Sequence, residues 1–555
     1  MTIKYKNGKI SFITLTPWTD VIFYSTVYIL WIYWFIFSLV TPVTLWDSNA
    51  YNISRLELML KEGLFRNSLF NDVRQEYVTW TFDAVHLPFR VLKFGESLPS
   101  FACLTGILLI TFKLVSNYYS KTCAILSCAA LLSMPCLMYQ ASSTKPDIAV
   151  IFCIFTWFYA LMLYRKSGFD RYIYLMALSL GFSSGSKATG LLLVPFAGIY
   201  TLYLLRSQKI VIYKILLSSI VCFILWGSVE IYANNLIHFG HLMQPSGNPS
   251  DSRNFDGFSG ALANFIRYIF SNTSTGLESY FTSFYQITQI WESLCRQILH
   301  YLHITDKGIQ VAWTLKLDDN SMHFLKTGSE TCSDYGPVGS LAIWVSIVYI
   351  LKNRLTIDVK YILILVTFLA LFLFSYVIGW GLWANRYLLF IFVPLTILVS
   401  IIIQDAKSKI ISNYFRICVI ISSVLTILCS FNKTPADMIN CITNRESYRL
   451  KENVSITPII NQMHQVIQKD RFVNVAISAG DDAWILPFYD IENLRMVPLP
   501  LNKYKNGIPN KDRLDYVLFL QTEPPDNITK NITLMCSFIG TGGFWGRNSY
   551  LYKIK

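Results

Sequence analysis

Charged residues are scarce in this chain of 555 residues. Only 15% of the residues are charged, whereas 53% are hydrophobic and the mean hydropathy is +0.41. A typical soluble domain has about 25% charged residues. This composition therefore excludes a soluble protein that buries its apolar residues in one core. Several apolar stretches reach about 20 residues, enough for a helix to cross about 30 Å of hydrocarbon. The sequence predicts a polytopic α-helical membrane protein.

Metal-binding and redox motifs are absent as well. The 12 Cys and 7 His form no Cys-x-x-Cys pair and no His–Cys spacing typical of zinc sites, and no repeat or low-complexity tract occurs. Four Cys lie in segments expected outside the membrane: Cys295, Cys332, Cys441 and Cys536. They could form one or two disulfides, and their spacing does not give the pairing.

The net charge of +13 does not predict a nucleic-acid partner, because most Lys and Arg lie in short loops between apolar segments, where they set the orientation of the protein. Eleven spans are expected near 19–42, 98–116, 122–140, 148–164, 172–186, 188–205, 210–232, 338–352, 360–380, 387–404 and 412–431. Basic clusters fall on alternate connections, beginning with Lys4, Lys6 and Lys9. This pattern predicts a cytoplasmic N-terminus, retained without signal cleavage, and an external C-terminus.

The large connections are all predicted on the external side. They are a first loop at about 43–97, a long loop at about 233–337 and a tail at 432–555, which leaves 1–431 as the membrane domain. In the tail, the short β-like runs "FVNVAIS", "LRMVPL" and "DYVLFLQ" alternate with polar turns. The helical pattern "ITPIINQMHQVIQ" precedes them, and together they predict a small α/β domain.

The first loop contains a pattern typical of a surface helix. Ile53, Leu56, Leu60 and Leu64 recur at helical spacing with charged residues between them, which predicts an amphipathic helix lying on the membrane.

Two acids lie at the expected external boundary of the membrane. Asp47 follows the first span in "LWDSNAY", and Asp147 opens the fourth span in "SSTKPDIAV". A charge this close to hydrocarbon is costly unless it is solvated or paired. Asp47 is either an ordinary interfacial acid or a general base, and Asp147 is either a helix cap after Pro146 or a site residue.

Basic residues on the same side complement these acids. Arg386 in "WANRYLLFIFVP" departs from the positive-inside trend, and Arg suits phosphate binding. Lys187 in "GFSSGSKATGLLL" either snorkels or enters the site. Its neighbours Gly181 and Gly185 favour close helix packing. Lys145 is close enough in sequence to pair with Asp147.

Further polar residues occur in the first loop and the tail. The first loop contains Asp72, Arg74, Glu76, Asp83 and His86 in "NDVRQEYVTWTFDAVHLPF". A lone His before Leu-Pro is more often structural than catalytic. The paired acids of "AGDDAWILPFYD" in the tail mark either a strand-to-loop turn or a lid over the site.

Together these motifs resemble the GT-C glycosyltransferases that use polyprenyl-phosphate sugars, in particular the protein O-mannosyltransferase and lipid A aminoarabinose transferase group. The resemblance is carried by "LWDSNAY", "DAVHLPF", "FGESLPSFACLTGIL", "SSTKPDIAV", "LGFSSGSKATGLLLVP" and "WANRYLLFIFVP", in this order. It covers about 40–205 well and 376–400 fairly. One departure is Ser48, which stands where relatives often have Glu after the Asp.

The resemblance implies an inverting transferase with Asp47 as catalytic base and Asp147 as a second acid. Arg386, Lys187 and Lys145 are the candidates for the donor phosphate. The expected substrate-binding residues are Arg74, Glu76, His86 and Tyr387. No cofactor is required, although a divalent cation at Asp147 is compatible with the sequence.

The expected partners are a polyprenyl-phosphate-linked sugar, a lipid, glycan or protein acceptor, and membrane lipids. A transporter or flippase and a non-catalytic envelope-polysaccharide assembly protein are the alternatives, although transporters usually carry charges at mid-membrane and only Glu230 lies near a span end. Asn-x-Ser/Thr sites occur at Asn52, Asn272, Asn453, Asn527 and Asn531. A glycan on Asn52 would crowd Asp47, which favours a bacterial inner membrane.

Overall fold

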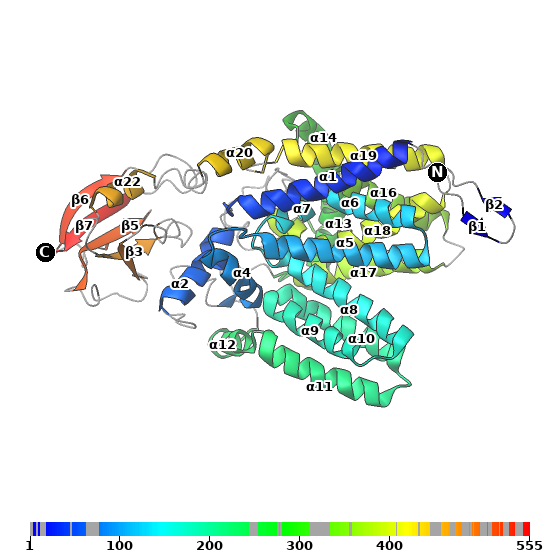
Figure 1. Ribbon diagram of the computed structural model, residues 1–555, viewed down its shortest axis with the longest axis horizontal. Helices are drawn as coiled ribbons and strands as arrows, with labels where there is room; N and C mark the ends of the chain where they lie inside the picture. The colour runs from blue at the N-terminus through cyan, green and yellow to red at the C-terminus, as the bar shows by residue number, and fades with distance from the viewer. Residues whose placement is uncertain are drawn as a thin grey trace.

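A computed structural model of the chain shows an elongated helical bundle with a small sheet domain at one end (Figure 1). The structure describes residues 4–6, 9–11, 18–44, 47–62, 77–242, 253–274, 277, 280–309, 333–353, 358–406, 408–430, 433–444, 457–466, 472–479, 488, 491, 493–499, 508, 513–520, 522–525, 532–538 and 548–554. The bundle and the sheet domain confirm the expected fold class.

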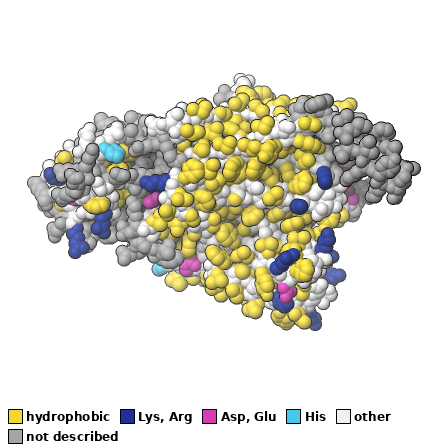
Figure 2. Space-filling model, in the orientation of Figure 1, with side chains coloured by type: hydrophobic (Ala, Val, Ile, Leu, Met, Phe, Trp, Pro, Cys, Tyr) yellow, Lys and Arg dark blue, Asp and Glu magenta, His cyan; other side chains and the backbone are white. Residues whose placement is uncertain are grey.

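Long apolar helices form the bundle. They are α1 (Trp18–Val40), α5 (Leu98–Tyr118), α6 (Lys121–Leu132), α7 (Pro135–Ala141), α8 (Asp147–Ser167), α9 (Arg171–Ser186), α10 (Ala188–Leu205), α11 (Lys209–Trp226), α16 (Gly336–Lys352), α17 (Val359–Val377), α18 (Leu389–Asp405) and α19 (Lys409–Leu428). Figure 2 shows apolar side chains over the middle of the visible face, with charged side chains toward its two ends.

Each expected span coincides with one or two of these helices. Eight helices of the described residues are long and apolar enough to cross a membrane, and the α6–α7 pair, bent by 76°, makes a ninth if it is one span. The helix α16 is a shorter apolar helix, and α9 has 16 residues. The protein is therefore an integral membrane protein, while the number of eleven spans stays a prediction.

Shorter elements connect the long helices. They are the strands β1 (Lys4–Lys6) and β2 (Lys9–Ser11), the π-helix η1 (Ser48–Ile53), α2 (Ser54–Glu62), α4 (Thr81–Val91), α12 (Val229–Phe239), α13 (Gly257–Thr273), η3 (Thr282–Phe284), α14 (Tyr285–Tyr301), η4 (Leu382–Leu388) and α20 (Pro435–Thr443). In Figure 1, α2, α4 and α20 lie at the same end of the bundle as the sheet domain. We call this end the site end.

The C-terminal domain contains a five-stranded mixed sheet. Its order is β4 (Leu494–Pro498), β3 (Val473–Ala479), β5 (Tyr516–Leu520), β7 (Ser549–Ile554) and β6 (Ile532–Phe538), with α22 (Thr457–Val466) beside it. The strands β3, β4 and β5 are parallel, whereas β6 and β7 are antiparallel to their neighbours. The sequence predicted β3, β4, β5 and α22 but not β6 or β7.

The helix α2 packs against this domain. Ile53 and Leu58 are buried in one apolar cluster with Ile459 and Met463 of α22 and Val475 of β3. A helix therefore lies in the expected segment, with Ile53 in η1 just before it, and its apolar residues enter a protein core. Its position on the membrane surface stays a prediction. Leu60 is exposed, and Leu64 lies outside the described residues.

The predicted disulfides have no support among the described Cys side chains. Cys295 and Cys441 are free and buried. Cys332 and the side chain of Cys536 lie outside the described part of the chain.

Small residues let α9 approach α11 closely, as the sequence predicted. A Cβ atom on Gly181 would lie 2.7 Å from the backbone of Cys222, and one on Gly185 would lie 1.9 Å from the carbonyl oxygen of Trp226. Backbone atoms cannot yield as a flexible side chain does, so these two positions require glycine.

We expect Gly185→Ala to lower the thermal midpoint of the purified protein, because forcing α9 and α11 apart costs about 1–3 kcal/mol. Gly198→Ala on α10 is the matched control, since no atom lies within 4 Å of a Cβ there. Alanine favours a helix by about 1 kcal/mol over glycine, so the control should keep or raise the midpoint. Equal midpoints for the two variants would contradict the close approach.

Candidate functional site

Asp47 lies seven residues after the end of α1 and directly before η1, at the site end of the bundle. Its Oδ2 is 2.6 Å from Nη1 of Arg386, which donates a hydrogen bond to it, and 3.0 Å from Nζ of Lys145. The side chains are 15%, 8% and 1% exposed, respectively. The carboxylate is thus held by two cations from η4 and from the loop before α8.

A second ion pair lies beside the first. Asp147 at the start of α8 accepts a hydrogen bond from Lys187, which connects α9 to α10. Tyr387 links the two pairs, because Nζ of Lys187 lies 4.1 Å from its ring centre and Nη2 of Arg386 donates to its hydroxyl at 3.1 Å. The structure therefore brings together all the predicted catalytic and phosphate-binding residues.

The pairing differs from one expectation. Lys145 contacts Asp47 rather than Asp147, whose partner is Lys187. Lys145 lies two residues before the start of α8 and its side chain extends to Oδ2 of Asp47, while Lys187 occupies the carboxylate of Asp147.

This cluster, formed by Asp47, Lys145, Asp147, Lys187 and Arg386, has three cations and two carboxylates and hence an excess of one positive charge. A positive excess at a low-dielectric boundary favours an anionic ligand. Arg and Lys are the donors that bind phosphate oxygens in proteins. The chemistry of the cluster therefore suits a phosphate next to a carboxylate.

The predicted substrate-binding residues divide into three groups. Tyr387 belongs to the cluster. His86 lies elsewhere, on α4, where it is buried and its Nδ1 is 2.7 Å from the carbonyl oxygen of Glu96. Arg74 and Glu76 lie outside the described residues, as does Asp72, so their roles stay predictions. The same holds for the paired acids Asp481 and Asp482.

A buried network of ionic residues supports the chain around Asp47. Arg90 of α4 binds the carboxylates of Glu57 and Glu96, the latter at 3.0 Å. The other carboxylate oxygen of Glu96 accepts the backbone N–H of Val43 at 3.0 Å. This network fixes the segment that leads from α1 to Asp47.

Asp83 forms the second part of the network. Its carboxylate accepts a hydrogen bond from Asn52 at 2.7 Å and lies 3.5 Å from Nη1 of Arg55. Burial raises the pKa of Asp83 to about 6, although Arg55 and Asn52 oppose this shift. The amide of Asn52 is therefore engaged inside the fold.

Sequence reasoning missed the roles of Glu57, Arg90 and Glu96. One signal was present, because Asp83, His86 and Arg90 fall on one face of α4 and all three are buried. Charged residues at helical spacing within a short helix indicated a polar interior contact. Their partners, however, come from α2 and from the loop before α5.

The described residues do not offer a set of metal ligands. They contain no group of three or more His, Cys, Asp or Glu side chains that is arranged to hold an ion. A cation at Asp147 would also have to compete with Lys187. Metal binding at Asp147 therefore stays a prediction.

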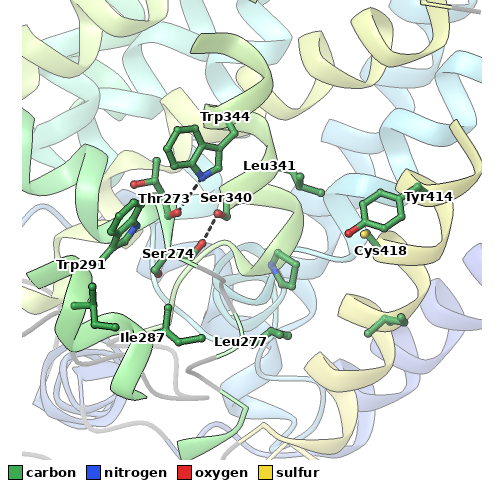
Figure 3. Close-up of a pocket in the computed structure, with 13 residues that line it drawn as sticks. Thr273, Ser274, Leu277, Ile287, Trp291, Ser340, Leu341, Trp344, Tyr414 and Cys418 are labelled. Carbon is green, nitrogen blue, oxygen red and sulfur yellow. Dashed lines mark hydrogen bonds between the residues drawn. The ribbon is translucent and has the colours of Figure 1, made fainter. Parts of the chain in front are cut away.

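An apolar cavity of about 570 Å³ lies among α13, α14, α16 and α19. Trp291, Leu341, Trp344 and Cys418 are among its lining residues (Figure 3). Two of its polar side chains bond within the wall, since Trp344 donates to the carbonyl of Thr273 and Ser340 to that of Ser274, whereas the buried indole N–H of Trp291 has no hydrogen-bond partner among the described residues.

Hydrogen bonds connect the wall of the cavity to the chain next to the cluster. Asn272, next to the lining residue Thr273, donates a hydrogen bond to the side chain of Asn385 at 3.1 Å. Tyr335, two residues before the lining residue Pro337, donates to the backbone carbonyl of Asn385. Asn385 immediately precedes Arg386.

Comparison with known proteins gives one family match. Residues 77–232 match the family described as dolichyl-phosphate-mannose-protein mannosyltransferase. The matched segment contains Lys145, Asp147 and Lys187, and it supports the resemblance to GT-C glycosyltransferases. It does not favour a transporter or an assembly protein. No curated protein matches the chain.

Two solved structures are similar to the chain at 10% sequence identity. They are ArnT from Cupriavidus metallidurans bound to undecaprenyl phosphate, with a TM-score of 0.48, and the same protein in the apo state, with a TM-score of 0.46. Each comparison covers 97% of this chain and 98% of the other.

We expect His86 to make the fold sensitive to acid. Burial lowers the pKa of His86 to about 4, whereas an unfolded histidine has a pKa of about 6.5. The unfolded chain therefore binds more protons between these values, and the stability falls as the pH falls from about 6.5 to about 4. At pH 5 the loss is about 2 kcal/mol.

The measurement is the change in thermal midpoint between pH 7 and pH 5. His86→Gln removes the titrating group and should show a smaller change than the parent protein. His300→Gln on α14 is the control, because His300 is exposed. A parent protein and a His86→Gln variant with the same acid sensitivity would contradict the assignment.

Proposed function

We propose that this chain is an inverting glycosyltransferase of the membrane, which moves one sugar from a polyprenyl-phosphate carrier to an acceptor on the extracytoplasmic face. The observation that carries the proposal is the carboxylate of Asp47 held between Arg386 and Lys145. The family match over 77–232 supports the same reaction.

The donor explains the need for cations. Its anomeric carbon is tethered to the membrane boundary by the lipid, and its leaving group is a phosphate. Negative charge develops on the phosphate oxygens as the carbon–oxygen bond breaks, and fixed cations stabilise that charge. We assign this role to Arg386, Lys187 and Lys145, which lie together in the cluster.

The acceptor explains the need for a carboxylate. A hydroxyl oxygen attacks the anomeric carbon from the face opposite the phosphate, so its proton must pass to a base. Asp47 takes this proton, the new glycosidic bond forms, and the polyprenyl phosphate leaves with the bonding electrons. One attack on one face inverts the anomeric carbon.

Donor binding must also rearrange the ion pairs of the cluster. Arg386 and Lys145 both lie against Oδ2 of Asp47. A phosphate that recruits these cations would weaken their hold on the carboxylate and leave it able to accept a proton. The ion pairs thus keep the charges satisfied until the donor arrives.

We assign the apolar cavity to the isoprenoid tail of the donor. The cavity has a volume of about 570 Å³ and a mainly apolar lining. Residues next to this lining bind Asn385, the residue that precedes Arg386. A tail placed there would leave its phosphate at the cluster.

The acceptor remains a lipid, glycan or protein, and the sugar a hexose or pentose. We place the protein in a bacterial inner membrane, with a cytoplasmic N-terminus. Two of the Asn-x-Ser/Thr sites support this placement. Their asparagines, Asn52 and Asn272, are buried, and the side-chain amides donate hydrogen bonds within the fold, so they are not accessible for N-glycosylation. A compartment that glycosylated them would conflict with this structure. The monophosphate donor requires no cofactor, and a divalent cation at Asp147 is optional.

We expect Asp47→Asn to lower sugar transfer by about 10²–10⁴-fold, because general-base assistance is lost. The assay uses the full chain in proteoliposomes, labelled dolichyl-phosphate mannose and other polyprenyl-phosphate sugars as donors, and a membrane extract as the acceptor. Asp170→Asn is the control, since Asp170 pairs with Lys214 at the surface. Full transfer by Asp47→Asn would overturn the proposal.

We expect Leu341→Trp to weaken binding of undecaprenyl phosphate by about 10-fold, the effect of losing about 1.4 kcal/mol of apolar contact. The added ring fills part of the cavity that we assign to the tail. The measurement is binding to the purified protein by native mass spectrometry. Leu217→Trp, at an exposed position of α11, is the control and should bind like the parent. Equal affinity of both variants would place the tail elsewhere.

A further inference from the structure

Lys433 is a buried lysine outside the cluster. It lies between α19 and α20, is 6% exposed, and its Nζ donates to both oxygens of Ser142, the carbonyl at 3.0 Å and the hydroxyl at 2.8 Å. Its Nζ also lies 5.6 Å from the ring centre of Phe37 on α1. Burial of an ammonium group is costly unless it is hydrogen-bonded, so these contacts are a specific feature of the fold.

Ser142 begins the loop that carries two residues of the cluster. It follows α7 directly, and the loop then leads through Lys145 to Asp147 at the start of α8. The hydroxyl of Ser143 accepts the backbone N–H of Lys145 at 3.2 Å and donates to the carbonyl of Gln140 at 2.9 Å. Side-chain contacts therefore set the path of this loop.

The segment around Lys433 also contacts α1, the helix that precedes Asp47 in the chain. The hydroxyl of Tyr33 on α1 donates to the backbone carbonyl of Lys433 at 2.9 Å. The thiol of Cys441 on α20 donates to the carbonyl of Val40, the last residue of α1, at 3.3 Å. Thr434 and Asp437 cap α20 reciprocally and fix its start. One short segment thus contacts both the end of α1 and the loop before α8.

We infer that Lys433 is a positioning residue, which sets the loop of Lys145 against the end of α1 and so places Lys145 on Asp47. The inference rests on the proposed function for its effect on the reaction, but its structural part does not. It also gives the start of the external tail a role at the site.

The structural part is tested by hydrogen exchange of the purified full chain. Lys433→Met keeps the apolar stem and removes the N–H donors. We expect the amides of peptides that cover 140–150 to exchange about tenfold faster, because the loop loses two hydrogen bonds. Peptides from β3 and β5 should not change. Lys360→Met is the control, since Lys360 pairs with Asp405 away from this loop. Unchanged exchange over 140–150 in Lys433→Met would overturn the inference.

The catalytic part is tested by transfer from labelled polyprenyl-phosphate sugars. We expect Lys433→Met to lower kcat/KM by about 10–100-fold, because a small misplacement of a site residue has effects of this size. Lys433→Arg keeps N–H donors and should restore most of the rate, which a purely structural loss would not predict. Faster exchange with an unchanged rate would overturn the catalytic part.

Ser142→Ala provides a second variant that does not depend on Lys433. It removes the hydroxyl and keeps the carbonyl that Lys433 binds, so we expect a smaller change in both measurements. If the parent protein transfers no sugar from any donor while exchange still responds to Lys433→Met, the proposed function fails and the positioning role stands.

Discussion

The structure depends on the rule that a charge at the edge of hydrocarbon must be paired or solvated. Asp47 and Arg386 are 339 residues apart in sequence, yet they meet at the site end of the bundle. Lys145, Asp147 and Lys187 come from three further positions along the chain. Their pairing requires the ends of α1, α8, α10 and η4 to converge. The contacts that neutralise these charges therefore also close the bundle at this end.

The cluster and the buried network at the site end differ in net charge. In the buried network, Arg90 is matched by Glu57 and Glu96, and Asp83 by Arg55. These residues are two arginines and three carboxylates, which leaves one negative charge in excess, and Glu96 also holds the backbone at Val43. The cluster, in contrast, carries one positive charge in excess. An anion that rearranges the ion pairs of the cluster therefore leaves the backbone before Asp47 held, because that backbone depends on a different set of ion pairs.

Much of the fold followed from local patterns in the sequence. Hydropathy located the helices, and short β-like runs between polar turns located β3, β4 and β5. The strands β3 and β5 are buried along nearly their whole length, so they appear in the sequence as short apolar runs. The strands β6 and β7 were missed. The strand β7 pairs with β5 and β6 pairs with β7, and these pairings are tertiary contacts that no local pattern shows. The site residues were found because acids and bases are rare near apolar segments. Their partners were not: Lys145 was expected beside Asp147, and Lys433 and Glu96 gave no local signal. Which charge meets which is decided by the packing of distant helices.

The C-terminal tail contacts the chain on both sides of Asp47. Its sheet shares an apolar cluster with Ile53 and Leu58, just after Asp47. Its first segment holds the end of α1 through Tyr33 and the loop before α8 through Ser142. Asp47 is thus fixed on one side by the membrane helices and on the other by a domain outside them. Because the chain on both sides of Asp47 is packed against other elements, the carboxylate can change ionic partners while its backbone stays in place.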